Sequence, residues 1–271
     1  MRGLLEYNRF RHDGIVRERP GIYKLRTSST LITLLLIMLS VPLAADPTPY
    51  RAVYKATYKG VPISATGIRE LTKTDDGHYL LTSVAKAIVA TVEESTKFRA
   101  IDEQVRPVEY RYDRRGIGRK ESDLLRFDWE SMQVSRIADD NAWERDISRG
   151  IQDKLSYQQE MREELIKAKE ASLPWPEMTY QVAEDDGRIR EYRFRVVGEE
   201  TVSVPAGTFH TIKAERVRDH SKRSTHFWLA PEHEFMLVRF EHQEDDGDGF
   251  KLLLREATLN GETVAGITDH R

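Results

Sequence analysis

Pairs of adjacent carboxylates are the most frequent groups in this sequence that could do acid–base chemistry. They include Glu93-Glu94, Asp139-Asp140, Glu163-Glu164, Asp185-Asp186 and Asp245-Asp246. A general acid needs a desolvated site that raises its pKa. Most of these pairs fall in predicted turns or on the charged face of a predicted helix, where water solvates them. This pattern argues against an enzyme, and we assign no catalytic residue.

The sequence gives equally little support for a metal or cofactor site. The chain has no cysteine, so thiolate catalysis and cysteine-ligated metals are excluded. The histidines beyond residue 45 are scattered and form no HExxH or HxH spacing. His226 and His233, with Glu232 and Glu234 nearby, leave a metal site open as an alternative, but a polar strand end explains them better. We therefore expect no cofactor and no metal.

Net charge argues against a nucleic-acid partner. The chain carries −3, and residues 1–45 hold seven Arg or Lys against three Asp or Glu, which leaves −7 on the rest. Phosphate backbones require clustered Lys and Arg. One basic loop, around Gly116 and Gly118, could make a peripheral membrane contact. Its neighbours Asp113, Glu121 and Asp123 offset the charge and favour a solvated hairpin.

Aromatic side chains offer binding in place of catalysis, because they recur at period two along predicted strands. A single curved sheet with one helix cannot bury both of its faces. We therefore expect part of the aromatic surface to line a cleft for an apolar ligand, with ordinary core packing as the alternative. The candidate ligand-binding residues are Tyr54, Tyr58, Tyr110, Phe127, Trp129, Phe194 and Trp228.

The elements that must position these residues are mostly strands. Alternating runs separated by turn residues every ten or so positions predict an antiparallel meander. Residues 153–171 alone show helical spacing, and Pro174 and Pro176 end that run. The prediction is a mostly β fold: a single strongly curved antiparallel sheet, as a half-barrel or open barrel, with one main amphipathic helix. Residues 46–271 are expected to form one domain.

The N-terminal segment predicts export. Lys24 and Arg26 precede an apolar run at residues 31–39, and Pro42 is followed by small residues. This order is typical of a secretory signal peptide, cleaved here near Ala44 or Ala45. A membrane span needs about 20 apolar residues, so an uncleaved anchor is the weaker alternative. Residues 1–45 are thus predicted to be an N-terminal extension and signal peptide, and the remainder to be periplasmic.

One block suggests a family. Val204, Pro205, Ala206, Gly207, Thr208 and Phe209, followed by Thr225, His226, Phe227, Trp228, Leu229, Ala230 and Pro231, resemble the bacterial envelope family catalogued as domain of unknown function 3108. The resemblance covers roughly residues 50–259. It implies an exported protein with a strongly curved sheet, similar to the half-barrels of periplasmic lipoprotein carriers of the LolA type. In those carriers a helical lid covers an apolar concave face. The charged segment 160–170 departs from such a lid.

Three functions stay open. The leading hypothesis is non-enzymatic binding of an apolar or lipid-like ligand, or an envelope-maintenance role with a lipid or a lipidated partner. A hydrolase of envelope polymers, using carboxylates or His226, is the second. The third is a structural module that pairs with partners through a sheet edge. The pattern specifies no oligomeric state.

Overall fold

The structure is a computed structural model that describes residues 46–58, 61–88, 90–116, 120–138, 140–219 and 222–267. The side chains of residues 61–64 are not described. The predicted signal peptide in residues 1–45 lies outside the described residues. Those from 46 onward belong to one compact unit.

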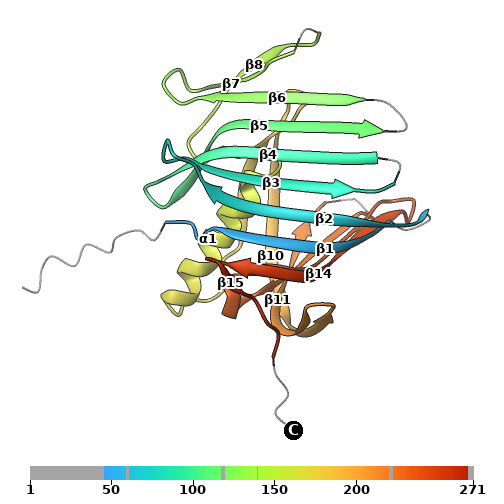
Figure 1. The fold of residues 1–271 in the computed structure, drawn as a ribbon. Helices are drawn as coiled ribbons and strands as arrows, with labels where there is room; N and C mark the ends of the chain where they lie inside the picture. The colour runs from blue at the N-terminus through green and yellow to red at the C-terminus, as the bar shows by residue number, and fades with distance from the viewer. Residues whose placement is uncertain are drawn as a thin grey trace, which may run out of the picture. The chain divides into compact units, whose positions relative to one another are not determined.

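The described residues form one antiparallel sheet and one α-helix, as the alternating pattern predicts (Figure 1). The first half holds β1 (Tyr50–Tyr58), β2 (Val61–Lys73), β3 (Tyr79–Lys86), β4 (Ala90–Ile101), β5 (Gln104–Gly116), β6 (Glu121–Asp128), β7 (Gln133–Arg136) and β8 (Trp143–Asp146). After the helix α1 (Ser156–Glu170) come β9 (Met178–Ala183), β10 (Ile189–Val204), β11 (Gly207–Val217), β12 (Ser224–Ala230), the 3₁₀ turn η1 (Pro231–His233), β13 (Met236–Gln243), β14 (Gly249–Leu259) and β15 (Glu262–Thr263).

The first strand joins the two halves of the sheet. The order is β8-β7-β6-β5-β4-β3-β2-β1-β14-β13-β12-β11-β10-β9, with β15 paired to β14. Along this order, adjacent strands are also consecutive in the chain, except that β1 pairs with β14 on its second edge. The sheet is not closed into a barrel, which confirms the predicted half-barrel.

The two ends of the sheet are nonetheless tied together. The Gln152 N–H donates to Gln181 O, and the Ala183 N–H donates to Gln152 O, both at 2.8 Å. Trp143 Nε1 on β8 donates to Asp185 O at 2.9 Å, in the turn between β9 and β10. The Trp143 side chain and the segment between β8 and α1 thus join the two ends of the sheet. In a closed barrel, a ladder of hydrogen bonds between strands would join them.

The helix begins at a reciprocal cap. The N–H groups of Leu155 and Ser156 donate to Asp153 Oδ1 at 2.8 and 2.7 Å, and Ser156 Oγ accepts the Asp153 N–H at 2.8 Å. This arrangement satisfies donors that a helix start leaves free. Tyr157, Met161 and Leu165 follow at helical spacing and are buried. In Figure 1, α1 lies behind the front layer of strands β1–β5, with β10 and β11 also behind that layer.

The polar residues of α1 explain why it does not resemble an apolar lid. Glu160 Oε2 accepts the Val105 N–H at 2.6 Å. Arg162 donates through Nε to Glu234 O and through Nη2 to Glu234 Oε2, at 2.6 and 2.8 Å. The helix is therefore bonded to β5 on one side and to the turn before β13 on the other. No helix among the described residues is long and apolar enough to span a membrane.

The Pro205-Ala206-Gly207 turn connects β10 and β11. Gly207 has a φ of 131°, and a Cβ there would lie 3.1 Å from Gly266 Cα. The Ile267 N–H donates to Thr208 O at 2.7 Å. The turn is therefore in close backbone contact with the chain after β15, and this approach requires glycine.

Candidate functional site

An apolar groove of about 430 Å³ lies between strands β1–β4, strands β13 and β14, and the start of α1. Its volume lies within the range of roughly 300–1,000 Å³ that is usual for small-molecule sites. The apolar residues around it come from both halves of the sheet, because β1 and β14 are neighbours. It is the best candidate for a site in the described part of the chain.

Small side chains form the floor of the groove. They are Ala56, Ala65, Gly67, Ser83 and Ala85, on β1, β2 and β3. The register pairs Ala56 with Ala65, and Gly67 with Ala85, so these residues share one face. A Cβ on Gly67 would meet Tyr54 Cβ at 3.5 Å, an ordinary contact. These short side chains leave the groove open above them, whereas neighbouring positions carry aromatic rings and leucines.

Large apolar residues surround this floor. Tyr58 and Phe250 face each other across β1 and β14 and stay 48% and 36% exposed. The ring centroids of Phe240 and Phe250 lie 5.2 Å apart. Leu252 completes this wall, and Tyr157 of α1 lies on the groove as well. Exposed rings beside an apolar groove are typical of a binding surface.

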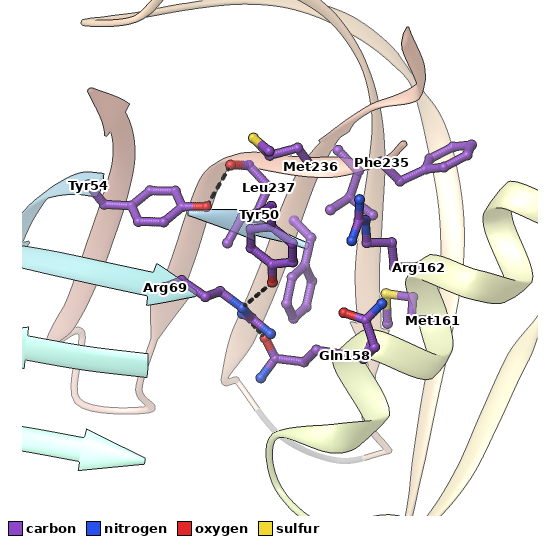
Figure 2. A pocket seen from close by; sticks show the side chains of 12 residues that line it. Tyr50, Tyr54, Arg69, Gln158, Met161, Arg162, Phe235, Met236 and Leu237 are labelled. Carbon is purple, nitrogen blue, oxygen red and sulfur yellow. Dashed lines mark hydrogen bonds between the residues drawn. The ribbon is translucent and has the colours of Figure 1, made fainter. Parts of the chain in front are cut away.

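A polar cluster lies beside the groove (Figure 2). Arg69, which lines the groove, donates through Nε to Tyr50 Oη at 3.1 Å and through Nη1 to Gln158 Oε1 at 2.5 Å. Tyr54 Oη donates to Leu237 O at 3.0 Å. Arg69 also lines a smaller cavity of about 30 Å³, which it shares with Arg162.

The two carboxylates whose pKa burial raises most have structural partners. Burial raises the pKa of Asp153 to about 6, although hydrogen bonds from Thr96, Ser156 and Leu155 oppose the rise. Burial likewise raises the pKa of Glu160 to about 7, opposed by the Val105 N–H. Both groups fasten α1, and neither lines the groove. Their raised pKa values follow from their place at the helix.

The histidine of the hydrolase alternative lies elsewhere. His226 Nε2 is 3.7 Å from Glu215 Oε2, and burial lowers the pKa of His226. Its neighbour Phe227 is packed in the core against Phe194, so the side chain of His226 lies on the opposite face of β12. No group of three or more His, Asp or Glu side chains in the described residues is placed to hold a metal ion.

Two of the predicted site residues, Tyr54 and Tyr58, line the groove. Tyr110, Phe127 and Phe194 are buried in the core. Trp129 Nε1 donates to Pro107 O at 2.7 Å, away from the groove.

Trp228 is also apart from the groove. Its Nε1 donates to Glu200 Oε2 at 2.7 Å, and its ring lies between Lys213 and Arg239. Sequence reasoning based on aromatic rings missed the small residues that create the space. The available signal was Ala or Gly at strand positions where the pattern otherwise places large side chains.

Comparison with known proteins identifies the family. The profile of the family described as protein of unknown function (DUF3108) matches residues 53–255. The chain belongs to this family. Among curated proteins, none matches the sequence. The DUF3108 match contains β2 to β13 in full, and all the residues that line the groove.

Solved structures resemble this DUF3108 chain in fold. A β-barrel-like protein of domain of unknown function DUF1849 from Brucella abortus is 14% identical, with a TM-score of 0.51 over 80% of this chain and 99% of that one. A chain of the MucA/MucB complex from Pseudomonas aeruginosa is 13% identical, with a TM-score of 0.31 over 82% of this chain and 54% of that one. The first similarity supports the fold, and the second is too slight to carry an argument.

Proposed function

We propose that this DUF3108 protein is an exported, non-enzymatic binding protein that holds an apolar, lipid-like ligand in its groove. The observation that carries the proposal is the groove itself: about 430 Å³ over a floor of small residues, with Tyr58 and Phe250 exposed beside it. Burying alkyl chain yields about 0.8 kcal/mol per CH₂. Ten methylenes would thus contribute roughly 8 kcal/mol before the costs of association are subtracted.

Filling the groove tests this function directly. Ala85 is exposed on the groove floor, so Ala85→Phe places a ring in the space without displacing a core residue. Lys86→Phe is the matched control, because adjacent strand residues point to opposite faces. The assay is displacement of a fluorescent acyl probe from the purified domain, residues 46–271, together with native mass spectrometry for lipid that copurifies.

The expected result is at least about a tenfold loss of probe affinity in Ala85→Phe, which corresponds to two or more methylenes displaced. Lys86→Phe should bind like the wild type. The proposal is overturned if the wild type binds no acyl probe and purifies without lipid. It is also overturned if Ala85→Phe, folded by circular dichroism, binds the probe as tightly as the wild type.

Export is the second part of the proposal and rests on residues 1–45. Expression of the full chain in a Gram-negative host, followed by periplasmic extraction, should yield a protein that starts near Asp46. N-terminal sequencing measures this start. A protein recovered from the cytoplasm with its N-terminus intact would contradict export while leaving the groove proposal untouched.

A further inference from the structure

Three arginines lie close enough to Tyr157, one of the α1 residues that line the groove, for their charges to act on its side chain. Arg69 on β2 lines the groove. Arg216 on β11 places Cζ 3.3 Å from the ring centroid of Tyr192, whose ring packs against that of Tyr157 at 5.4 Å. Arg218 donates through Nη2 to Thr225 Oγ1 at 2.9 Å. Burial raises the pKa of Tyr157 to about 12, and the charges of these three arginines oppose the rise.

None of the three forms an ion pair with another described residue, in contrast to several other arginines of the chain. Arg69 donates to a tyrosine hydroxyl and an amide oxygen, which are both neutral. Arg218 keeps Nη1 buried without a hydrogen-bond partner in the described part of the chain. By comparison, Arg136 pairs with Asp123 and Arg162 with Glu234. Guanidinium groups withdrawn from water are costly unless an anion pairs with them.

We propose that these arginines hold the anionic head group of a single-chain lipid, of the fatty-acid class, whose alkyl chain lies in the groove. This inference rests on the proposed function and names its ligand. Guanidinium groups match the planar carboxylate and bind it through paired N–H donors. The volume of about 430 Å³ is at the lower end of the usual range, which favours one chain over two.

One carboxylate faces the same region. Glu94 lines the groove and accepts a hydrogen bond from Tyr110 Oη at 2.7 Å. The register places Arg69 and Glu94 on either side of Ser83, on one face of the sheet. The ammonium of Lys154 lies over the ring of the same Tyr110, and Lys154 pairs with Asp185. Three unpaired cations against one carboxylate leave a positive region. Arg216 on β11 and Arg218, which follows that strand directly, do not line the groove themselves and belong to the other half of the sheet from Glu94 on β4.

The test compares ligands that share one chain and differ in the head. Palmitate and hexadecanol are titrated against the domain, residues 46–271, by displacement of a fluorescent acyl probe. The variant is Arg216→Gln with Arg218→Gln, and the control is Arg195→Gln, an exposed β10 arginine paired with Glu215. Thermal melting checks that each variant is folded. Lysophosphatidic acid, a phosphate head on one chain, is the third ligand.

The wild type should bind palmitate at least about tenfold more tightly than hexadecanol, as expected for a charge-assisted hydrogen bond. The double variant should lose that preference and keep the affinity for hexadecanol, whereas Arg195→Gln should change neither. Equal affinity of the wild type for palmitate and hexadecanol overturns the head-group assignment but leaves the groove proposal standing. Stronger binding of lysophosphatidic acid than of palmitate overturns the carboxylate class. Binding of none of the three contradicts the proposed function itself.

Discussion

Replacing Asp153 by asparagine should remove a pH dependence from the stability of the protein. The Asp153 carboxylate is fully buried and receives hydrogen bonds from Thr96 Oγ1 at 2.6 Å and from the Leu155 and Ser156 N–H groups. Asparagine keeps an oxygen for the two N–H groups. Its NH₂ can donate to the Thr96 hydroxyl, which can reverse from donor to acceptor. The change therefore removes the titration and keeps the cap.

The magnitude follows from the pKa of Asp153, which burial raises from 3.8 to about 6. A raised carboxyl pKa means that the folded state binds the proton more tightly than the unfolded state. The free energy of unfolding is therefore highest below about pH 4 and falls as the pH rises through about 6. Two pKa units correspond to about 3 kcal/mol. The wild type should lose this amount, from this group, between about pH 4 and pH 7.

Urea unfolding of the domain, residues 46–271, followed by the fluorescence of its tryptophans, measures both proteins at intervals from about pH 4 to pH 7. Other groups, including Glu160 with its raised pKa, titrate in both proteins and cancel in the difference. The variant should gain about 3 kcal/mol on the wild type across this range. A difference that stays constant with pH would refute the reasoning, because Asp153 would then have similar pKa values in the folded and unfolded states.

Two further changes test the packing of α1 and of the turn between β10 and β11. Leu165→Ala, at a fully buried position of α1, should lower the free energy of unfolding by about 2–5 kcal/mol in urea titrations; a loss under about 1 kcal/mol would mean that α1 is not packed in the core. Gly207→Ala should cost about 1–3 kcal/mol, because φ is 131° and the new Cβ would meet Gly266. Its effect should appear as a lower melting temperature, and an unchanged value would contradict the close contact with the C-terminal segment.

The sequence by itself determined the strands, the helix and their order. Period-two alternation places every second residue on one face, and turn residues such as Asp185, Asp186 and Gly187 end the runs, so an antiparallel meander follows from local chemistry. The one segment with helical spacing became α1, with its start moved from 153 to Ser156. The start differs because Asp153 is a capping residue: its carboxylate accepts the Ser156 N–H from outside the helix. The short strand β8 escaped prediction because four residues carry too little periodicity.

The sequence did not locate the candidate site, because residue type does not indicate which face of the sheet is concave. Phe227 and Trp228 are neighbours and both are buried, yet they lie on opposite faces of β12: Phe227 packs against Phe194, and the Trp228 ring lies between Lys213 and Arg239. The groove depends on long-range pairing: Tyr58 meets Phe250 only because β1 and β14 are adjacent. Its space depends on small residues of three strands brought into register, a coincidence that no single stretch of sequence contains. Local periodicity determines the strands, whereas only their tertiary pairing decides where the side chains leave a groove.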